Sequence, residues 1–310
     1  MKWKGVIPAI TTPFDANLRV DLAFMADHCR WLVDNGCSAI VALGSLGEGA
    51  TLAFDEKIAI LKNCVKAAGD RVPVASAISA LSTREAVDLA KAASDAGCQG
   101  LMVLPPYVYV GDWREMKAHV SAIVKATDLS CMLYNNPVAY VIDFLPEQIA
   151  ELASEHGNLH AVKESSSDAR RVTAIKALLR DRLAVLVGVD DALVEGAGVG
   201  AIGWIAGLVN AFPRESVDLL NFALKGERES AAELYYWFLP LLRMDTVPKF
   251  VQLIKLVQQE VGVGNARVRP PRLQLAGPEL ESARETIHET IRNRPVHSQS
   301  SKMQQVSYAQ

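Results

Sequence analysis

A lysine stands at the end of what reads as a short buried strand, and its position suggests covalent chemistry. Lys163 lies in the run from Leu159 to Glu164, which is apolar apart from His160 and is followed by a helix start at residues 165–168. A lysine in this position is poorly solvated, so its pKa falls and part of it is free amine. A free amine can attack a carbonyl carbon and form a Schiff base. The alternative is a lysine whose ammonium simply reaches water.

Two further polar features follow the ends of other apolar runs. Tyr134 ends the preceding strand, so its phenol can lie near Lys163. The turn from Gly44 to Gly49 contains glycines that let the backbone N–H groups of Ser45 and Leu46 converge on one point, which suits a carboxylate. Each feature also has a plain structural interpretation: a half-buried tyrosine with a wet hydroxyl, or a tight connection between a strand and a helix.

Eight alternations of strand and helix predict how these groups are positioned. Continuous apolar runs predict strands, each followed by a helix, at residues 6–10, 39–43, 72–78, 100–104, 130–133, 159–164, 183–187 and 201–205. Strands of this kind are buried on both faces of a parallel sheet, and eight of them favour a closed (β/α)8 TIM barrel, an α/β fold, over an open doubly wound sheet. Active sites of such barrels lie at the C-terminal ends of the strands. We expect a barrel over residues 1–225, a helical extension over 226–293 and a disordered tail over 294–310.

Composition narrows the classes of partner. The chain has 310 residues, of which 50% are hydrophobic, and a net charge of −3 without a basic block, so we expect no nucleic-acid partner. Its five cysteines form no CxxC pair, which predicts reduced thiols rather than disulfides or a zinc site. No signal-peptide region or membrane span is evident, so the sequence predicts a cytoplasmic protein with no membrane partner.

Three motifs, in this order and on these predicted strands, resemble the dihydrodipicolinate synthase / N-acetylneuraminate lyase family. They are Gly44-Ser45-Leu46-Gly47-Glu48, Tyr134-Asn135-Asn136-Pro137 and Val162-Lys163-Glu164, supported by residues 8–14 and 188–191. The resemblance covers residues 1 to about 290. It implies that Lys163 is the Schiff-base lysine, that Tyr134 transfers protons and that Ser45 relays to Tyr134. It also implies a homotetramer, no metal and no organic cofactor, and substrate contacts from Ser45, Leu46, Gly47, Gly188, Ile202 and Trp204.

Several positions depart from the family's synthases. A second threonine of the turn is replaced by Leu46, a paired tyrosine that reaches across a subunit interface by Val108, and a carboxylate-binding arginine by Ala139. These differences disfavour 4-hydroxy-tetrahydrodipicolinate synthase. Trp204, with Ile202 and Ile205 beside it, stands where sialic-acid lyases carry a small hydroxyl residue, which indicates a smaller substrate.

The sequence therefore predicts a Schiff-base lyase or deaminase for a small 2-oxo or cyclic 2-imino carboxylic acid. Within the family the motifs are nearest in appearance to the 1-pyrroline-4-hydroxy-2-carboxylate deaminases of hydroxyproline breakdown. A 2-keto-3-deoxy sugar-acid aldolase or dehydratase and the synthase remain alternatives. A non-catalytic barrel that acts as a binding protein is an alternative of another class.

Overall fold

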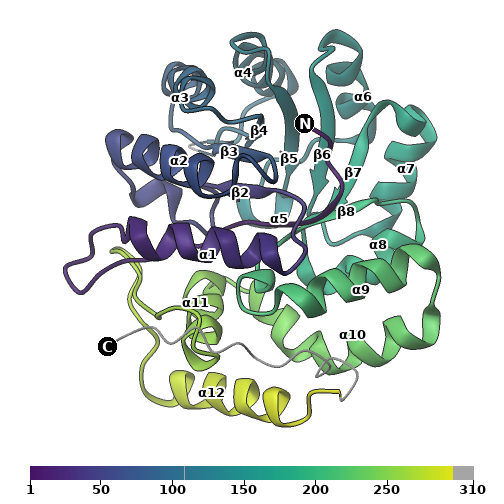
Figure 1. Cartoon of the computed structure of the whole chain (residues 1–310). Coiled ribbons are helices and arrows are strands. Elements are labelled where there is room, and N and C mark those ends of the chain that lie inside the picture. Colours follow the sequence, from purple (N-terminus) through teal and green to yellow (C-terminus); the bar gives the residue numbers. More distant parts are fainter. Residues whose placement is uncertain (108, 296–310) are drawn as a thin grey trace.

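Eight parallel strands form the centre of the computed structural model, which describes residues 1–107 and 109–295. The strands are β1 Gly5–Pro8, β2 Ile40–Ala42, β3 Val74–Ile78, β4 Gly100–Val103, β5 Ser130–Asn135, β6 Leu159–Glu164, β7 Ala184–Val187 and β8 Gly203–Ala206. Their order is β1-β8-β7-β6-β5-β4-β3-β2, and a parallel bridge between Ala9 and Val41 joins the two ends of the sheet. The predicted (β/α)8 barrel is confirmed (Figure 1).

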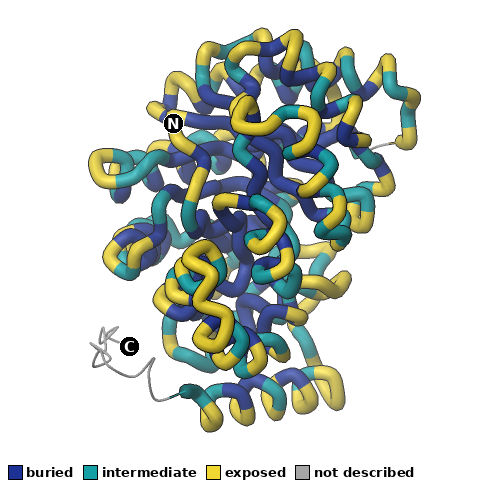
Figure 2. The backbone as a smooth tube through the Cα atoms, turned by 90° about the vertical axis from the view of Figure 1, so that its right-hand side faces the viewer, coloured by how far each residue is buried: buried dark blue, intermediate teal, exposed yellow. Residues whose placement is uncertain are grey.

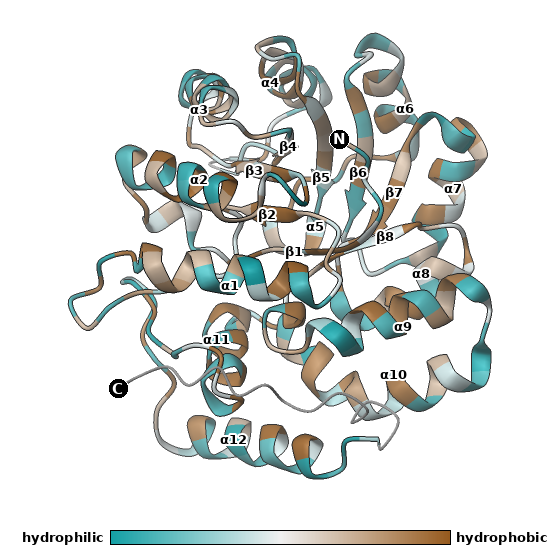
Figure 3. Cartoon of the chain, viewed as in Figure 1, coloured by the Kyte–Doolittle hydropathy of each residue, from teal (hydrophilic) through white to brown (hydrophobic). Residues whose placement is uncertain are grey.

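Helices surround the strands and continue beyond the barrel. They are α1 Leu22–Asp34, α2 Phe54–Ala68, α3 Thr83–Asp95, α4 Trp113–Lys125, α5 Pro137–Tyr140, α6 Pro146–Glu155, α7 Ala169–Leu179, α8 Leu193–Gly198, α9 Pro213–Lys225, α10 Arg228–Leu242, α11 Phe250–Glu260 and α12 Gly277–Arg292. Side chains of Asp21, Ser82 and Asp112 accept hydrogen bonds from backbone N–H groups three residues later and so begin α1, α3 and α4. Figure 3 shows that the surface helices have hydrophobic and hydrophilic sides.

Burial follows the predicted pattern of a two-sided sheet. All residues of β2, β3, β4 and β5 are buried, and the buried segments lie inside the shell of partly exposed helices (Figure 2). The barrel is therefore a packed core, and polar groups inside it at the strand ends are kept from bulk water.

The eighth strand lies two residues later than its predicted start. The sequence predicts a strand at 201–205, whereas β8 spans Gly203–Ala206. Ala201 and Ile202 extend the same apolar run, and hydrophobicity alone cannot separate a strand from the residues that lead into it. Because of this shift, Ile202, which the sequence analysis assigns to the substrate site, lies before the strand and not at its C-terminal end.

The C-terminal segment packs against one side of the barrel. Helix α9 ends at Lys225 and α10 begins at Arg228, close to the predicted boundary between barrel and extension, whose independence as a domain stays a prediction. Helices α10, α11 and α12 lie together beside α9 (Figure 1). Lys255 of α11 donates to Glu48 at 2.5 Å, in a buried ion pair that ties the extension to the turn after β2.

Two predictions fall largely outside the described residues. Val108 is not described, and neither is the tail from 296 onwards. Arg294, at the start of the predicted tail, is described and forms an ion pair with Glu215. Within residues 1–107 and 109–295, no helix is long and apolar enough to cross a lipid bilayer.

Candidate active site

A cavity of about 450 Å³ lies where the strands end. Its walls include Lys163 near the end of β6, Tyr134 near the end of β5, and Gly188 and Gly207 just beyond β7 and β8. Ser45, in the turn after β2, completes this ring of barrel residues. The structure thus brings together groups that are far apart in the sequence, at the end of the barrel where such folds carry their sites.

Lys163 and Tyr134 are direct neighbours across two strands. They are register partners between β6 and β5, and the Nζ atom of Lys163 lies 4.1 Å from the centroid of the Tyr134 ring. Burial lowers the pKa of Lys163 to about 8, although the charges of Asp245 and Asp190 oppose this shift. At pH 7 roughly one lysine in ten is then a neutral amine, compared with far fewer for an exposed lysine.

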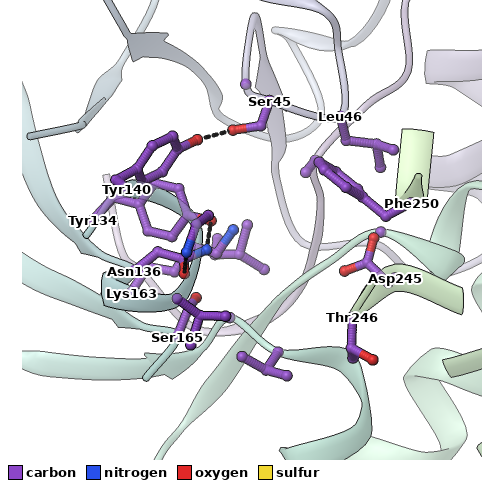
Figure 4. A pocket seen from close by; sticks show the side chains of 18 of the residues that line it. Ser45, Leu46, Tyr134, Asn136, Tyr140, Lys163, Ser165, Asp245, Thr246 and Phe250 are labelled. Carbon is purple, nitrogen blue, oxygen red and sulfur yellow. Dashed lines mark hydrogen bonds between the residues drawn. The ribbon is translucent and has the colours of Figure 1, made fainter. Parts of the chain in front are cut away.

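The phenol of Tyr134 is held in the cavity by a neighbouring amide. Asn136 donates to the Tyr134 oxygen at 2.9 Å (Figure 4). Burial raises the pKa of Tyr134 to about 12, while the hydrogen bond from Asn136 partly offsets the shift by stabilising the phenolate. Before Lys163 reacts with a substrate, Tyr134 therefore carries its proton at neutral pH.

Ser45 bonds to a different tyrosine from the one that the family resemblance implies. The Ser45 hydroxyl is hydrogen-bonded to the phenol of Tyr140, at the end of α5 (Figure 4). The Tyr140 ring meets Tyr134 edge-on, with centroids 5.9 Å apart, and burial raises the pKa of Tyr140. No hydrogen bond between Ser45 and Tyr134 occurs among the described residues, so the relay from Ser45 to Tyr134 stays a prediction.

Two backbone N–H groups in the turn after β2 have no hydrogen-bond partner among the described residues. In the described part of the chain, the backbone N–H groups of Ser45 and Leu46 donate no hydrogen bond. Both residues line the cavity. Gly47 does not, and it instead accepts a bond from Thr12 at 2.6 Å and packs so closely that an added Cβ would lie 2.9 Å from a backbone oxygen. This close packing constrains the shape of the turn, and a contact between Gly47 and the substrate stays a prediction.

Gly188 lines the cavity, and a larger residue at this position would collide with Lys163. A Cβ atom there would lie 2.0 Å from the Ser165 oxygen and 2.5 Å from Cε of Lys163. We expect Gly188→Ala to fold but to lose about a hundredfold in imine formation, since displacing a reacting group by about 1 Å has that cost. Gly157→Ala, at a site with no atom within 4 Å, is the matched control and should react normally. Equal rates for both variants in a borohydride trapping assay would contradict this placement.

Ile202 and Trp204 lie away from the cavity, contrary to the sequence-based prediction. Ile202 precedes β8 at the opposite end of the barrel and is 42% exposed. Trp204 is fully buried and donates to the carboxylate of Asp190 at 2.9 Å, and Ile205 reaches the cavity instead. The cause is the later start of β8, combined with the alternation of side chains along a strand. The size of Trp204 therefore gives no limit on the size of the substrate.

Several polar cavity residues were not assigned to the site from the sequence. Among them are Tyr140, Ser165, Asp245 and Arg272. Tyr140 and Ser165 stand close in sequence to the two predicted reactive residues, and their nearness was a usable signal. Asp245 and Arg272 come from the C-terminal extension, where nothing in the sequence marks them as functional.

Asp190 is buried beside the cavity and has a structural role. Its carboxylate accepts bonds from the Trp204 indole and from the backbone N–H groups of Gly207 and Leu208, at 2.8–3.1 Å. Burial nevertheless raises its pKa to about 6. In residues 1–107 and 109–295, no group of three or more His, Cys, Asp or Glu side chains could hold a metal ion. The lack of a cofactor stays a prediction.

Comparison with known proteins agrees with the fold. The 4-hydroxy-tetrahydrodipicolinate synthase of Agrobacterium fabrum is 31% identical over 281 residues, covering 91% of this chain and 96% of that protein. The crystal structure of a dihydrodipicolinate synthase from Bacillus anthracis superposes with a TM-score of 0.89 at 28% identity, over 95% of this chain and 99% of that one. The chloride-inhibited synthase of Acinetobacter baumannii, crystallised with pyruvate, gives 0.88 at 28% identity, over 93% and 99%.

The match to the family is nearly as long as the chain. The sequence model of the dihydrodipicolinate synthetase family matches residues 2–292, so the match includes both the barrel and the helical extension. The family is one of lyases. This chain is a member of the dihydrodipicolinate synthetase family.

Proposed function

We propose that this protein is a Schiff-base lyase that acts on a small 2-oxo or cyclic 2-imino carboxylic acid. The observation that carries the proposal is the position of Lys163, whose amine is buried, lines the cavity and lies 4.1 Å from the Tyr134 ring. Its lowered pKa leaves neutral amine available for attack on C2 of the substrate. The unused N–H groups of Ser45 and Leu46 would hold the neighbouring carboxylate.

Tyr134 is suited to act first as an acid and then as a base. As the C2–O bond of the carbinolamine breaks, its phenol gives a proton to the departing oxygen, so that water leaves and an iminium and a phenolate remain. The fixed positive charge of the iminium stabilises the phenolate, despite a pKa of about 12 in the free enzyme. The phenolate then removes a proton from C3, which gives an enamine and restores the phenol.

The reaction that we favour is elimination, with 1-pyrroline-4-hydroxy-2-carboxylate as the specific candidate. Loss of its C4 hydroxyl from the enamine, ring opening and hydrolysis would release ammonia and a 2-oxo acid semialdehyde. A cavity of about 450 Å³ accommodates a ring of this size. A 2-keto-3-deoxy sugar-acid dehydratase or aldolase would use the same lysine and tyrosine.

A second candidate is 4-hydroxy-tetrahydrodipicolinate synthase. It is favoured by the names of the relatives, several of which are at least 30% identical over three quarters or more of this chain. It is also favoured by Arg272, a cavity-lining cation that could bind a second carboxylate in place of the arginine missing at Ala139.

A competition of substrates tests the choice between these candidates. We expect elimination from hydroxypyrroline carboxylate or a 2-keto-3-deoxy acid to be clearly faster than the condensation of pyruvate with aspartate semialdehyde. The elimination rate is measured as the release of ammonia, water or semialdehyde. The reason is that Leu46 and Ala139 lack the polar groups of the synthases, and one contact to a charged group is worth about ten- to a hundredfold in affinity. Efficient condensation, further reduced by Arg272→Ala, would assign the protein to the synthases.

A further inference from the structure

The cavity has an acidic wall that the reaction scheme above leaves unused. Asp245 is the last residue of a short 3-10 helix, Arg243–Asp245, between α10 and α11, and it lines the cavity. Figure 4 shows its carboxyl group on the side of the cavity opposite Tyr134 and Tyr140, with Thr246 beside it. The lysine therefore lies between a phenolic wall and a carboxylic wall.

Close packing fixes Asp245 in this place. The carboxyl group lies against Gly207, just beyond β8, where an added Cβ would come within 2.0 Å of Oδ1. None of the hydrogen bonds and ion pairs within residues 1–107 and 109–295 includes the Asp245 side chain, whereas nearby Asp191 pairs with Arg243 at 3.6 Å. A carboxyl group that is held at a cavity wall without a protein partner has its oxygens free for a ligand.

The surroundings of Asp245 favour its protonated form. Burial and the negative charge of Asp190 raise the pKa of Asp245 well above its usual range, and the charge of Lys163 opposes this shift. Asp190 differs because three hydrogen-bond donors stabilise its carboxylate. Two neighbouring carboxyl groups are thus pushed towards different protonation states, which is how acid and base roles are divided in a site.

We propose that Asp245 is the general acid that protonates the leaving group of the substrate, opposite the phenol that removes the C3 proton. The inference rests on the proposed Schiff-base function and adds a residue from the helical extension to the catalytic groups. It also narrows the substrate to acids with a hydroxyl at C4, whose departure needs a proton.

The step balances as follows. In the enamine, the nitrogen lone pair reforms the C2=N bond, the C2=C3 electrons form a C3=C4 bond, and the C4–O bond breaks. The proton of Asp245 joins the departing oxygen, so that water leaves, with an unsaturated iminium and a carboxylate left behind. Positive charge returns to the Lys163 nitrogen as negative charge forms on Asp245, and the attraction between them lowers the barrier in a site with little water. Hydrolysis of the iminium frees the lysine and returns a proton to Asp245.

The test uses a leaving group that needs no proton. Wild type and Asp245→Asn are given a 2-oxo acid with a hydroxyl at C4 and the same acid with chloride at C4. We expect Asp245→Asn to eliminate water on the order of 10²–10⁴ times more slowly and to release chloride within about threefold of wild type. Borohydride trapping of pyruvate should also stay within about threefold, because pyruvate has no leaving group. Asp191→Asn, which removes a carboxylate outside the cavity wall, is the matched control and should behave as wild type.

Three results would overturn the inference. One is an unchanged rate of water elimination in Asp245→Asn, and another is an equal loss with hydroxyl, chloride and pyruvate, which would indicate a purely structural role. The third is a wild-type protein that forms the pyruvate adduct but releases neither water nor chloride from the C4-substituted acids. That result would overturn the role of Asp245 and leave the Schiff-base proposal intact. A wild-type protein that forms no adduct with any 2-oxo acid would instead remove the proposed function itself.

Discussion

Replacement of Lys163 by alanine is expected to abolish both turnover and the covalent adduct that borohydride forms with a bound 2-oxo acid. The amine is the proposed nucleophile, and among the described residues that line the cavity no other side chain can form an iminium at C2. Intact-mass measurement should show one added substrate skeleton on the wild-type chain and none on Lys163→Ala. An adduct of equal yield on the variant would refute the assignment.

Lys255 provides an internal control for this experiment. Burial lowers its pKa to about 8 as well, so both lysines have a similar fraction of neutral amine. Lys255, however, is bonded to Glu48 at 2.5 Å and to the backbone oxygen of Arg267 at 2.6 Å, and it does not line the cavity. Peptide mapping should therefore find the label on Lys163 alone. Labelling of Lys255 would mean that a low pKa, rather than the site, decides reactivity.

The same pKa predicts how the trapping rate depends on pH. Below the pKa of about 8 most of Lys163 is protonated and unreactive, so the rate should rise about tenfold per pH unit from 6 to 7. It should level off above about pH 9, because nearly all of the amine is then neutral. A midpoint near that of an exposed lysine would show that the amine is well solvated.

The barrel and its two central residues could be predicted because they depend on local patterns. Eight apolar runs at regular spacing specify eight buried strands, and successive strands of a barrel are neighbours. Tyr134 and Lys163, each near the end of one of two successive strands, had to lie close together, and they are register partners. Neither their roles nor those of Ser45 and Leu46 are tested by the fold, so these remain proposals.

The rest of the cavity depends on contacts that no local pattern encodes. Asp245 and Arg272 reach the site only because the extension packs against the barrel, and hydrophobic spacing predicts its helices but not where they are placed. The hydrogen bond between Ser45 and Tyr140 depends on the short helix α5, four residues long, which is too short to have a periodic signal. The misplacement of Ile202 came from a two-residue error at one strand start, which changes how far along the barrel a residue lies. Trp204 was misplaced because side chains alternate along a strand, and Ile205, not Trp204, faces the cavity.

Tyr134→Phe should separate proton transfer from imine formation. The variant keeps the aromatic ring on which the lysine packs and loses only the phenol oxygen that Asn136 holds. General acid–base catalysis by one side chain contributes on the order of 10²–10⁴ in rate, so we expect turnover to fall by that factor while the chain still folds and still traps some pyruvate. Exchange of the pyruvate methyl protons in heavy water should fall in parallel, because this exchange measures removal of the C3 proton from the iminium.

A second buried phenol serves as the control for Tyr134→Phe. Tyr235 is buried in α10, and its hydroxyl donates to the backbone oxygen of Asp191 rather than to a group in the cavity. Burial raises its pKa too, so an effect caused simply by deleting a buried hydroxyl should be seen in both variants. We expect Tyr235→Phe to lose some stability but to exchange protons and turn over within a few-fold of wild type. If Tyr134→Phe also stays within a few-fold, another group moves the C3 proton, and Tyr140, whose ring lies 5.9 Å away, is the next residue to replace.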